Sequence, residues 1–244
     1  MTSGLKGQGS LKKRRWLFSC PLLALIALDL GLIAFRALLY QPFFSQPGAL
    51  IFLLEPTLLL FVYAGIVLAI AVTSFVPGRL QALRVGTIIG LTTGVMWVVN
   101  LGLETFTNLS GLTSILCTAP FLLGAFVLWS IGAGQIGWTS GAPVQGVLAA
   151  VWSAMICVLI TIAFGLLLTF TSIPRLEQQL AADPDYLRSG WSNIHAFAIA
   201  NSFDSAFSHL LGALIIASVA GTVGGIAGTA LGSRKGRDQY TTQP

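Results

Sequence analysis

Six long apolar segments constrain the fold of this chain more than any other feature. They cover approximately residues 16–40, 49–76, 85–106, 114–134, 144–171 and 203–231. Each has about 20 residues or more, which is the length that an α-helix needs to cross the hydrocarbon core of a bilayer. Only 9% of the residues are charged, against about 25% in soluble domains. We therefore predict an all-α, polytopic membrane protein, with a bundle of six transmembrane helices formed by residues 16–232.

The basic residues indicate how the bundle is oriented. Most of the Lys and Arg residues lie in two terminal tails, 1–15 and 233–244, and Arg79 and Arg84 flank the loop after the second segment. Cytoplasmic loops carry an excess of Lys and Arg. We expect both termini on the cytoplasmic side, the first tail disordered, and the polar segment 172–201 on the outer side. The predicted location is a cell membrane, most simply a bacterial inner membrane.

The predicted partners follow from the same charge pattern. The bilayer itself is the first, and the basic tails suggest contact with anionic lipids. Basic residues that flank apolar segments indicate topology and not binding to nucleic acid, so no nucleic-acid partner is expected. A homo-oligomer or a membrane partner protein is a further expectation. The three cysteines show no paired spacing, so we interpret them as small packing residues.

The third segment, Val85–Phe106, divides into two faces at 100° per residue. One face is small or polar and includes Trp97 and Glu104, and the opposite face is apolar and includes Leu91 and Val99. This pattern predicts that the small and polar face packs inside the bundle. We expect this helix to be the central one.

Several polar side chains are predicted in the outer half of the bundle, contributed by four of the six helices. These candidate ligand-binding residues are Asp29, Arg36, Glu55, Asn100, Glu104, Asp204 and His209. Ionisable residues inside a membrane are costly and are often functional. Our hypothesis is that they surround one hydrated cavity. The alternative is that they are separate interhelical contacts, with Arg36 pairing with Glu55.

Glycines repeat at four-residue spacing in the inner half of the third and sixth segments. The predicted helix-packing residues are Gly86, Gly90, Gly94, Gly221, Gly224, Gly225, Gly228 and Gly232. Small residues at this spacing let two helices approach closely. We expect these two helices to cross each other and to close the inner half, with self-association as the competing interpretation.

The sequence shows no motif that assigns a reaction. The two histidines do not form a zinc motif, no nucleophile-and-base spacing is present, and no cofactor is expected. We favour transport or sensing of a small solute or ion through the polar cavity. The alternative is a non-catalytic accessory or assembly protein that packs through its glycines. An intramembrane enzyme is a remote third hypothesis.

Overall fold

The computed structural model describes residues 3–72, 78–107 and 112–241, with side chains for residues 16–72, 78–107, 112, 113 and 115–233. Every element in these ranges is helical. They are α1 (Ser3–Leu39), the 3-10 helix η1 (Gln41–Ser45), α2 (Ala49–Val72), α3 (Arg79–Thr107), α4 (Leu112–Ser140), α5 (Pro143–Leu180), α6 (Pro184–Arg188) and α7 (Ile194–Thr241). Six of the helices are long and apolar enough to cross a membrane. The prediction of an all-α, multi-pass membrane protein is confirmed.

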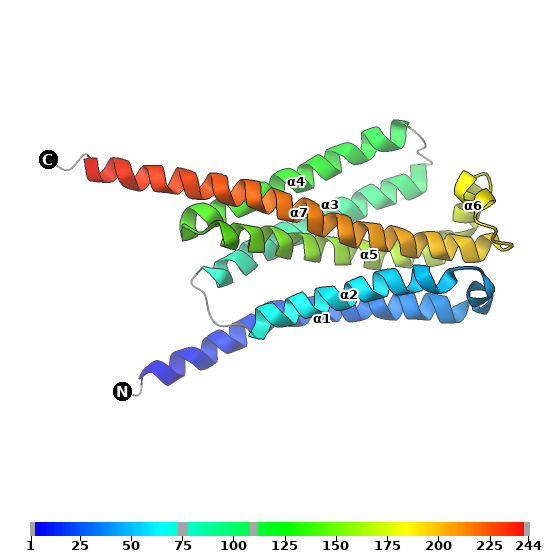
Figure 1. The fold of residues 1–244 in the computed structure, drawn as a ribbon, viewed down its shortest axis with the longest axis horizontal. Helices are drawn as coiled ribbons and strands as arrows, with labels where there is room; N and C mark the ends of the chain where they lie inside the picture. The colour runs from blue at the N-terminus through cyan, green and yellow to red at the C-terminus, as the bar shows by residue number, and fades with distance from the viewer. Residues whose placement is uncertain (1–2, 73–77, 108–111, 242–244) are drawn as a thin grey trace.

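The long helices run back and forth along one axis (Figure 1). Both termini lie at one end of the bundle, which we name the terminal end, and η1 and α6 lie at the other, which we name the cap end (Figure 1). The hairpin of α1 and α2 packs against α5 and α7, and α3 and α4 pack on the remaining sides of α5. The cap end is the end that we expected on the outer side of the membrane.

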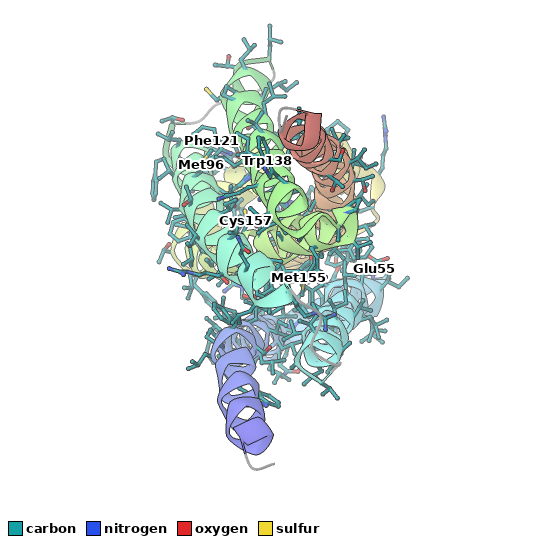
Figure 2. The ribbon with its side chains drawn as sticks, turned by 90° about the vertical axis from the view of Figure 1, so that its left-hand side faces the viewer. Glu55, Met96, Phe121, Trp138, Met155 and Cys157 are labelled. Atoms are coloured by element: carbon teal, nitrogen blue, oxygen red, sulfur yellow. The ribbon has the colours of Figure 1, made fainter. Side chains whose placement is uncertain are left out.

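The central helix is α5, and our expectation that α3 would be central is wrong. Within the most apolar window of each span, 72% of the α5 residues are buried, against 33% for α3. Helix α5 packs against α1, α3, α4 and α7. Met155 and Cys157 of α5 lie in the middle of the cross-section, whereas Glu55 of α2 lies towards its side (Figure 2). A helix that packs on four others needs apolar residues around its whole circumference, and the sequence of α5 supplies them.

The helices extend beyond several predicted boundaries. Helix α1 begins at Ser3, so the tail that we expected to be disordered continues the first helix. Residues 73–76 of the second predicted segment lie outside the described residues. Pro174 falls within the polar segment 172–201, but it lies inside α5. The helix continues because Ile173 and Leu180 are buried in the core, and proline is tolerated in helices that neighbouring helices support.

The apolar face of α3 points away from the bundle, as predicted. Ile88, Val95 and Phe106 are 57–65% exposed, whereas Gly90 and Asn100 are buried. Many other large apolar side chains are exposed on the outer faces of α1, α2, α4 and α7. An apolar surface of this extent indicates contact with lipid.

The glycines make close helix contacts, but not between the two helices that we expected. A Cβ atom on Gly86 or Gly90 of α3 would lie 2.7 or 2.6 Å from a carbonyl oxygen of α5. Gly224 and Gly228 of α7 instead face the backbone of α4 at Ser130 and Gly134. The prediction that α3 and α7 cross at their glycines is therefore wrong. The central position of α5 gives each glycine series a different partner.

Further glycines bring α4, α5 and α7 together at the terminal end. A Cβ atom on Gly221 would lie 2.8 Å from the Val147 Cα of α5, and one on Gly225 would lie 2.7 Å from the Pro143 carbonyl oxygen. Gly94 of α3, in contrast, packs on the α5 side chain of Ile160. A Cβ atom on Gly232 of α7 would lie 3.1 Å from the Trp138 carbonyl oxygen of α4, so there is more room at this glycine. The backbones are in contact at this end, which leaves little space between these helices.

Candidate functional site: a polar pocket in the cap-end half

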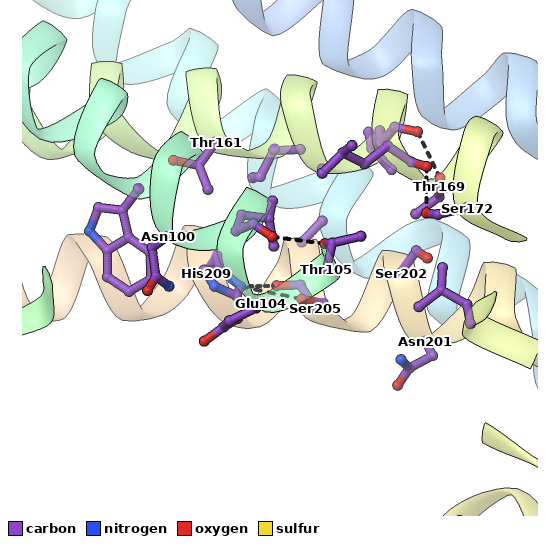
Figure 3. Close-up of a pocket in the computed structure, with 18 of the residues that line it drawn as sticks. Asn100, Glu104, Thr105, Thr161, Thr169, Ser172, Asn201, Ser202, Ser205 and His209 are labelled. Atoms are coloured by element: carbon purple, nitrogen blue, oxygen red, sulfur yellow. Dashed lines mark hydrogen bonds between the residues drawn. The ribbon is translucent and has the colours of Figure 1, made fainter. Parts of the chain in front are cut away.

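A pocket of about 230 Å³ opens between α3, α5 and α7 in the cap-end half (Figure 3). Three of the seven candidate residues line it: Asn100 and Glu104 from α3 and His209 from α7. The polar residues that complete its lining are Thr105, Thr161, Thr169, Ser172, Arg175, Gln179, Asn201, Ser202 and Ser205. The pocket is therefore more polar than the membrane-facing surface around it.

Asn100 is the buried polar group of this pocket. Its side chain is only 2% exposed, and its Oδ1 atom has no hydrogen-bond partner. Leaving a buried acceptor unpaired costs about 1–3 kcal/mol. The neighbouring α3 residue Leu101 faces Gly165, which places Asn100 beside the middle of the cap-end half of α5. Because this oxygen is itself buried, a ligand donor in the pocket would pair with it once the Asn100 amide turns towards the pocket.

Glu104 lies one turn further towards the cap end on the same face of α3. Its Oε1 atom accepts a hydrogen bond from the Thr118 hydroxyl of α4. The contact fixes the carboxylate between α3 and α4, and its side chain remains partly exposed. A carboxylate accepts up to about four hydrogen bonds, so Glu104 retains capacity for further donors in the pocket.

His209 is held by its own helix. Its Nδ1 atom lies 2.7 Å from the Ser205 carbonyl oxygen, and its ring meets the Trp97 indole edge-on with centroids 6.0 Å apart. Because a carbonyl oxygen only accepts, Nδ1 carries the hydrogen, and in the neutral ring Nε2 is then an acceptor. The contact with Trp97 joins α7 to α3 at the deep end of the pocket.

The hydroxyl groups of the lining use their own hydrogens on the helix backbone. Thr105, Thr169 and Ser172 donate to the carbonyl oxygens of Leu101, Leu166 and Leu168 over 2.7–2.8 Å. Their oxygens keep free lone pairs. Together with Asn100 and Glu104, they supply acceptors beside the donors of Arg175, Gln179 and Asn201. The arrangement suits a ligand that brings hydrogen-bond donors.

Four of the candidate residues do not line this pocket. Asp29 of α1 is fully buried away from this pocket, and neither of its carboxyl oxygens has a hydrogen-bond partner. Arg36 lies 4.8 Å above the Phe170 ring of α5 and forms no ion pair with Glu55 within the described part of the chain. Glu55 is half-buried on α2, and Asp204 is exposed on α7. The seven residues thus do not surround a single cavity.

The polar face of α7 explains why Asp204 is absent from the pocket. Phe203, Ala206 and Leu210 are buried against the bundle, as their helical spacing predicts. On the polar side of α7, Asn201, Ser202, Ser205 and His209 line the pocket, whereas Asp204 is exposed and does not line it. Helical periodicity assigns residues to the faces of a helix, but it does not tell which neighbouring helix each face contacts.

Sequence reasoning missed most of the α5 contribution to the site. Arg175 belongs to the polar segment 172–201 that we expected on the outer side of the bundle, and the Thr and Ser residues of α5 carry no motif. Their spacing offers one signal, because Thr161, Thr169, Ser172 and Gln179 follow each other by whole helical turns with some drift. That signal becomes visible only once α5 is known to continue to Leu180.

A second polar cluster, which we name the cap cluster, joins the helices at the cap end. The Nδ1 atom of His195 lies 2.6 Å from Glu177 Oε1, and the His195 ring stacks on Tyr40 with centroids 4.2 Å apart. Asn193 donates to the Tyr40 hydroxyl over 2.8 Å, and Ser192 donates its backbone N–H to Gln46 over 3.1 Å. These contacts connect α1 and η1 to the ends of α5 and α7.

Among the described residues, no group of three or more His, Cys, Asp or Glu side chains is arranged to hold a metal ion. Comparison with protein-family models, with curated proteins and with solved structures finds no match to this chain.

Proposed function

We propose that this multi-pass membrane protein binds a small solute in the pocket between α3, α5 and α7, as the recognition step of transport or sensing. The unpaired Oδ1 atom of Asn100 carries the proposal. A ligand with a hydroxyl or amine group would satisfy this buried acceptor, and the protein has no internal donor for it among the described residues.

The closed and open halves support binding from one side. The glycine contacts hold the terminal-end half together backbone to backbone, and the pocket lies entirely in the cap-end half. With the basic tails in the cytoplasm, the pocket would open towards the outer side. In this proposal the ligand enters from outside and binds above a closed inner half.

The glycine contacts also favour this function over an accessory role. Gly90, Gly224 and Gly228 already face backbone atoms of the same chain. A partner helix that used these glycines would have to displace α4 or α5. The glycines therefore support a stable bundle around the pocket more directly than they support assembly with another protein.

Thermal stability of the purified protein in phosphatidylcholine nanodiscs tests the proposal. The probes are glucose, glycerol, ethanolamine, glycine and sodium ions, and the variants are Asn100→Leu and Glu104→Gln. A ligand at about 100 times its Kd stabilises by about 2.7 kcal/mol. We expect at least one donor-bearing probe to raise the Tm of the wild type, and Asn100→Leu to abolish that shift.

Glu55→Gln is the matched control, because Glu55 is a half-buried carboxylate that does not line the pocket. It should keep the full ligand-induced shift. The proposal is overturned if no donor-bearing probe stabilises the wild type, or if Asn100→Leu keeps a shift equal to that of Glu55→Gln.

A further inference from the structure

A mainly apolar pocket lies next to the polar one. A second pocket of about 210 Å³ lies between α3, α4, α5 and α7, and its wall is mainly apolar, with Leu122, Trp129, Val158 and Ile216. Trp97, Thr161 and His209 line both pockets. We name the first the polar chamber and the second the apolar chamber. The two chambers lie side by side, and these three residues belong to the lining of both.

The register of the helices orders the chambers along the bundle axis. Gly94 packs on Ile160 and Leu101 packs on Gly165, so α3 and α5 run in parallel with matching depth. The apolar chamber begins at Cys157 and Val158, and the polar chamber continues to Gln179. The distance along α5 is about 30 Å at 1.5 Å per residue. A ligand that used both chambers would have its apolar part deep and its polar part towards the cap end.

From this arrangement we infer that the ligand is an amphiphile, with a hydroxyl-bearing polyol head in the polar chamber and an apolar tail in the apolar chamber. The inference rests on the proposed function and names its ligand class. A polar solute alone would leave the apolar chamber empty or filled with water that few groups there could bind. A simple hydrocarbon would leave the Asn100 acceptor unpaired.

The chemistry of the polar chamber favours a polyol head over a charged one. Glu104 and Arg175 place one carboxylate and one guanidinium in the same lining, so their charges balance. The remaining polar groups are acceptor-rich at Asn100 and at the hydroxyls that donate to the backbone. Hydroxyl groups donate to these acceptors and also accept from Arg175 and Gln179.

Gly212 offers a way to block the apolar chamber without disturbing the fold. It lines that chamber, and a Cβ atom placed on it meets no heavy atom within 4 Å. Gly65 of α2 also has open space, and it lines neither chamber. Gly212→Leu and Gly65→Leu are therefore a matched pair that adds the same side chain inside and outside the chamber.

Binding is measured on the full chain in phosphatidylcholine nanodiscs, with glucose as the head alone and alkyl glucosides of increasing chain length below their micellar concentration. We expect the longest alkyl glucoside to bind the wild type at least about tenfold more tightly than glucose, because each buried methylene adds to affinity. Gly212→Leu should remove most of this gain and leave glucose binding unchanged, and Gly65→Leu should change neither.

A further experiment distinguishes the two sources of such a ligand, which are the bilayer and the surrounding solution. Glucosyl-diacylglycerol included in the nanodisc should displace the alkyl glucoside if the amphiphile comes from the bilayer, and should not displace it if a single-chain amphiphile enters from solution. Either result is compatible with the inference and assigns the source.

The inference is overturned if chain length has no effect, or if Gly212→Leu and Gly65→Leu bind the longest alkyl glucoside equally well. In both cases the proposed function survives if glucose or ethanolamine still binds in a manner that depends on Asn100. Binding by no probe, or binding that Asn100→Leu leaves intact, overturns both.

Discussion

The two halves of this bundle are held together by different interactions. In the terminal-end half, glycines bring α4, α5 and α7 into backbone contact, and α3 meets α5 in the same way. In the cap-end half, the helices separate around the two chambers, and side-chain contacts such as Glu177 with His195 connect them. The difference shows how a membrane bundle can be closed at one end and accessible at the other. Where backbones are in contact, no room is left for a ligand. Where long side chains connect the helices, the backbones stay apart and space for a ligand remains between them.

The strongest test of this comparison is Gly228→Leu. The added side chain would collide with the backbone of α4 at Gly134, which cannot rotate away as a side chain would. Overpacking typically costs about 1–3 kcal/mol, and here we expect a loss of at least about 3 kcal/mol. Unfolding of the purified protein in detergent measures it.

The control for Gly228→Leu is Gly65→Leu, which introduces the same residue where a Cβ atom meets nothing within 4 Å. Its unfolding free energy should stay within about 0.5 kcal/mol of the wild type. Equal stability of the two variants would contradict the claim that backbone contact closes the terminal-end half.

A second test concerns Asp29, a buried polar group that belongs to neither the glycine contacts nor the chambers. Both carboxyl oxygens lack hydrogen-bond partners, and such groups are costly to bury. Asp29→Leu, a branched apolar replacement, should raise the unfolding free energy by about 1–3 kcal/mol. A rise of the Tm in detergent shows that Asp29→Leu stabilises the protein, and a fall contradicts this prediction.

Ligand binding shows whether Asp29 also has a role in function. Because Asp29 does not line the polar chamber, Asp29→Leu should leave the Asn100-dependent Tm shift intact. Loss of that shift in a stabilised Asp29→Leu variant would mean that the α1 and α2 layer takes part in the site.

The smallest effect is expected in the cap cluster. Glu177 and His195 are each about 30% exposed, and pairs accessible to solvent contribute about 0.2–1 kcal/mol. Glu177→Gln should therefore lower stability by about 0.5 kcal/mol. Unfolding of the purified variant in detergent measures the difference from the wild type. A loss as large as that of Gly228→Leu would show that the two halves are held with equal strength.

The sequence predicted the helices themselves better than it predicted which helices pack against each other. The number of membrane-length helices and the two faces of α3 follow from hydropathy and helical periodicity, which are local properties. The ends were predicted less well, because burial of Ile173 and Leu180 carries α5 through Pro174. Of the candidate site, Asn100, Glu104 and His209 lie together, whereas Asp29 and Arg36 lie elsewhere.

The sequence by itself determined that this chain is a bundle of apolar helices, that Gly86, Gly90 and Asn100 share a buried face, and that polar residues gather in one half of the bundle. Only the tertiary structure decided that α5 is central, that the glycines of α3 and α7 meet different helices, and that a polar chamber lies next to an apolar one. The physical reason is that periodicity fixes the direction of a side chain around its own helix. Which helix stands opposite depends on how all six pack at once, and no local pattern encodes that arrangement.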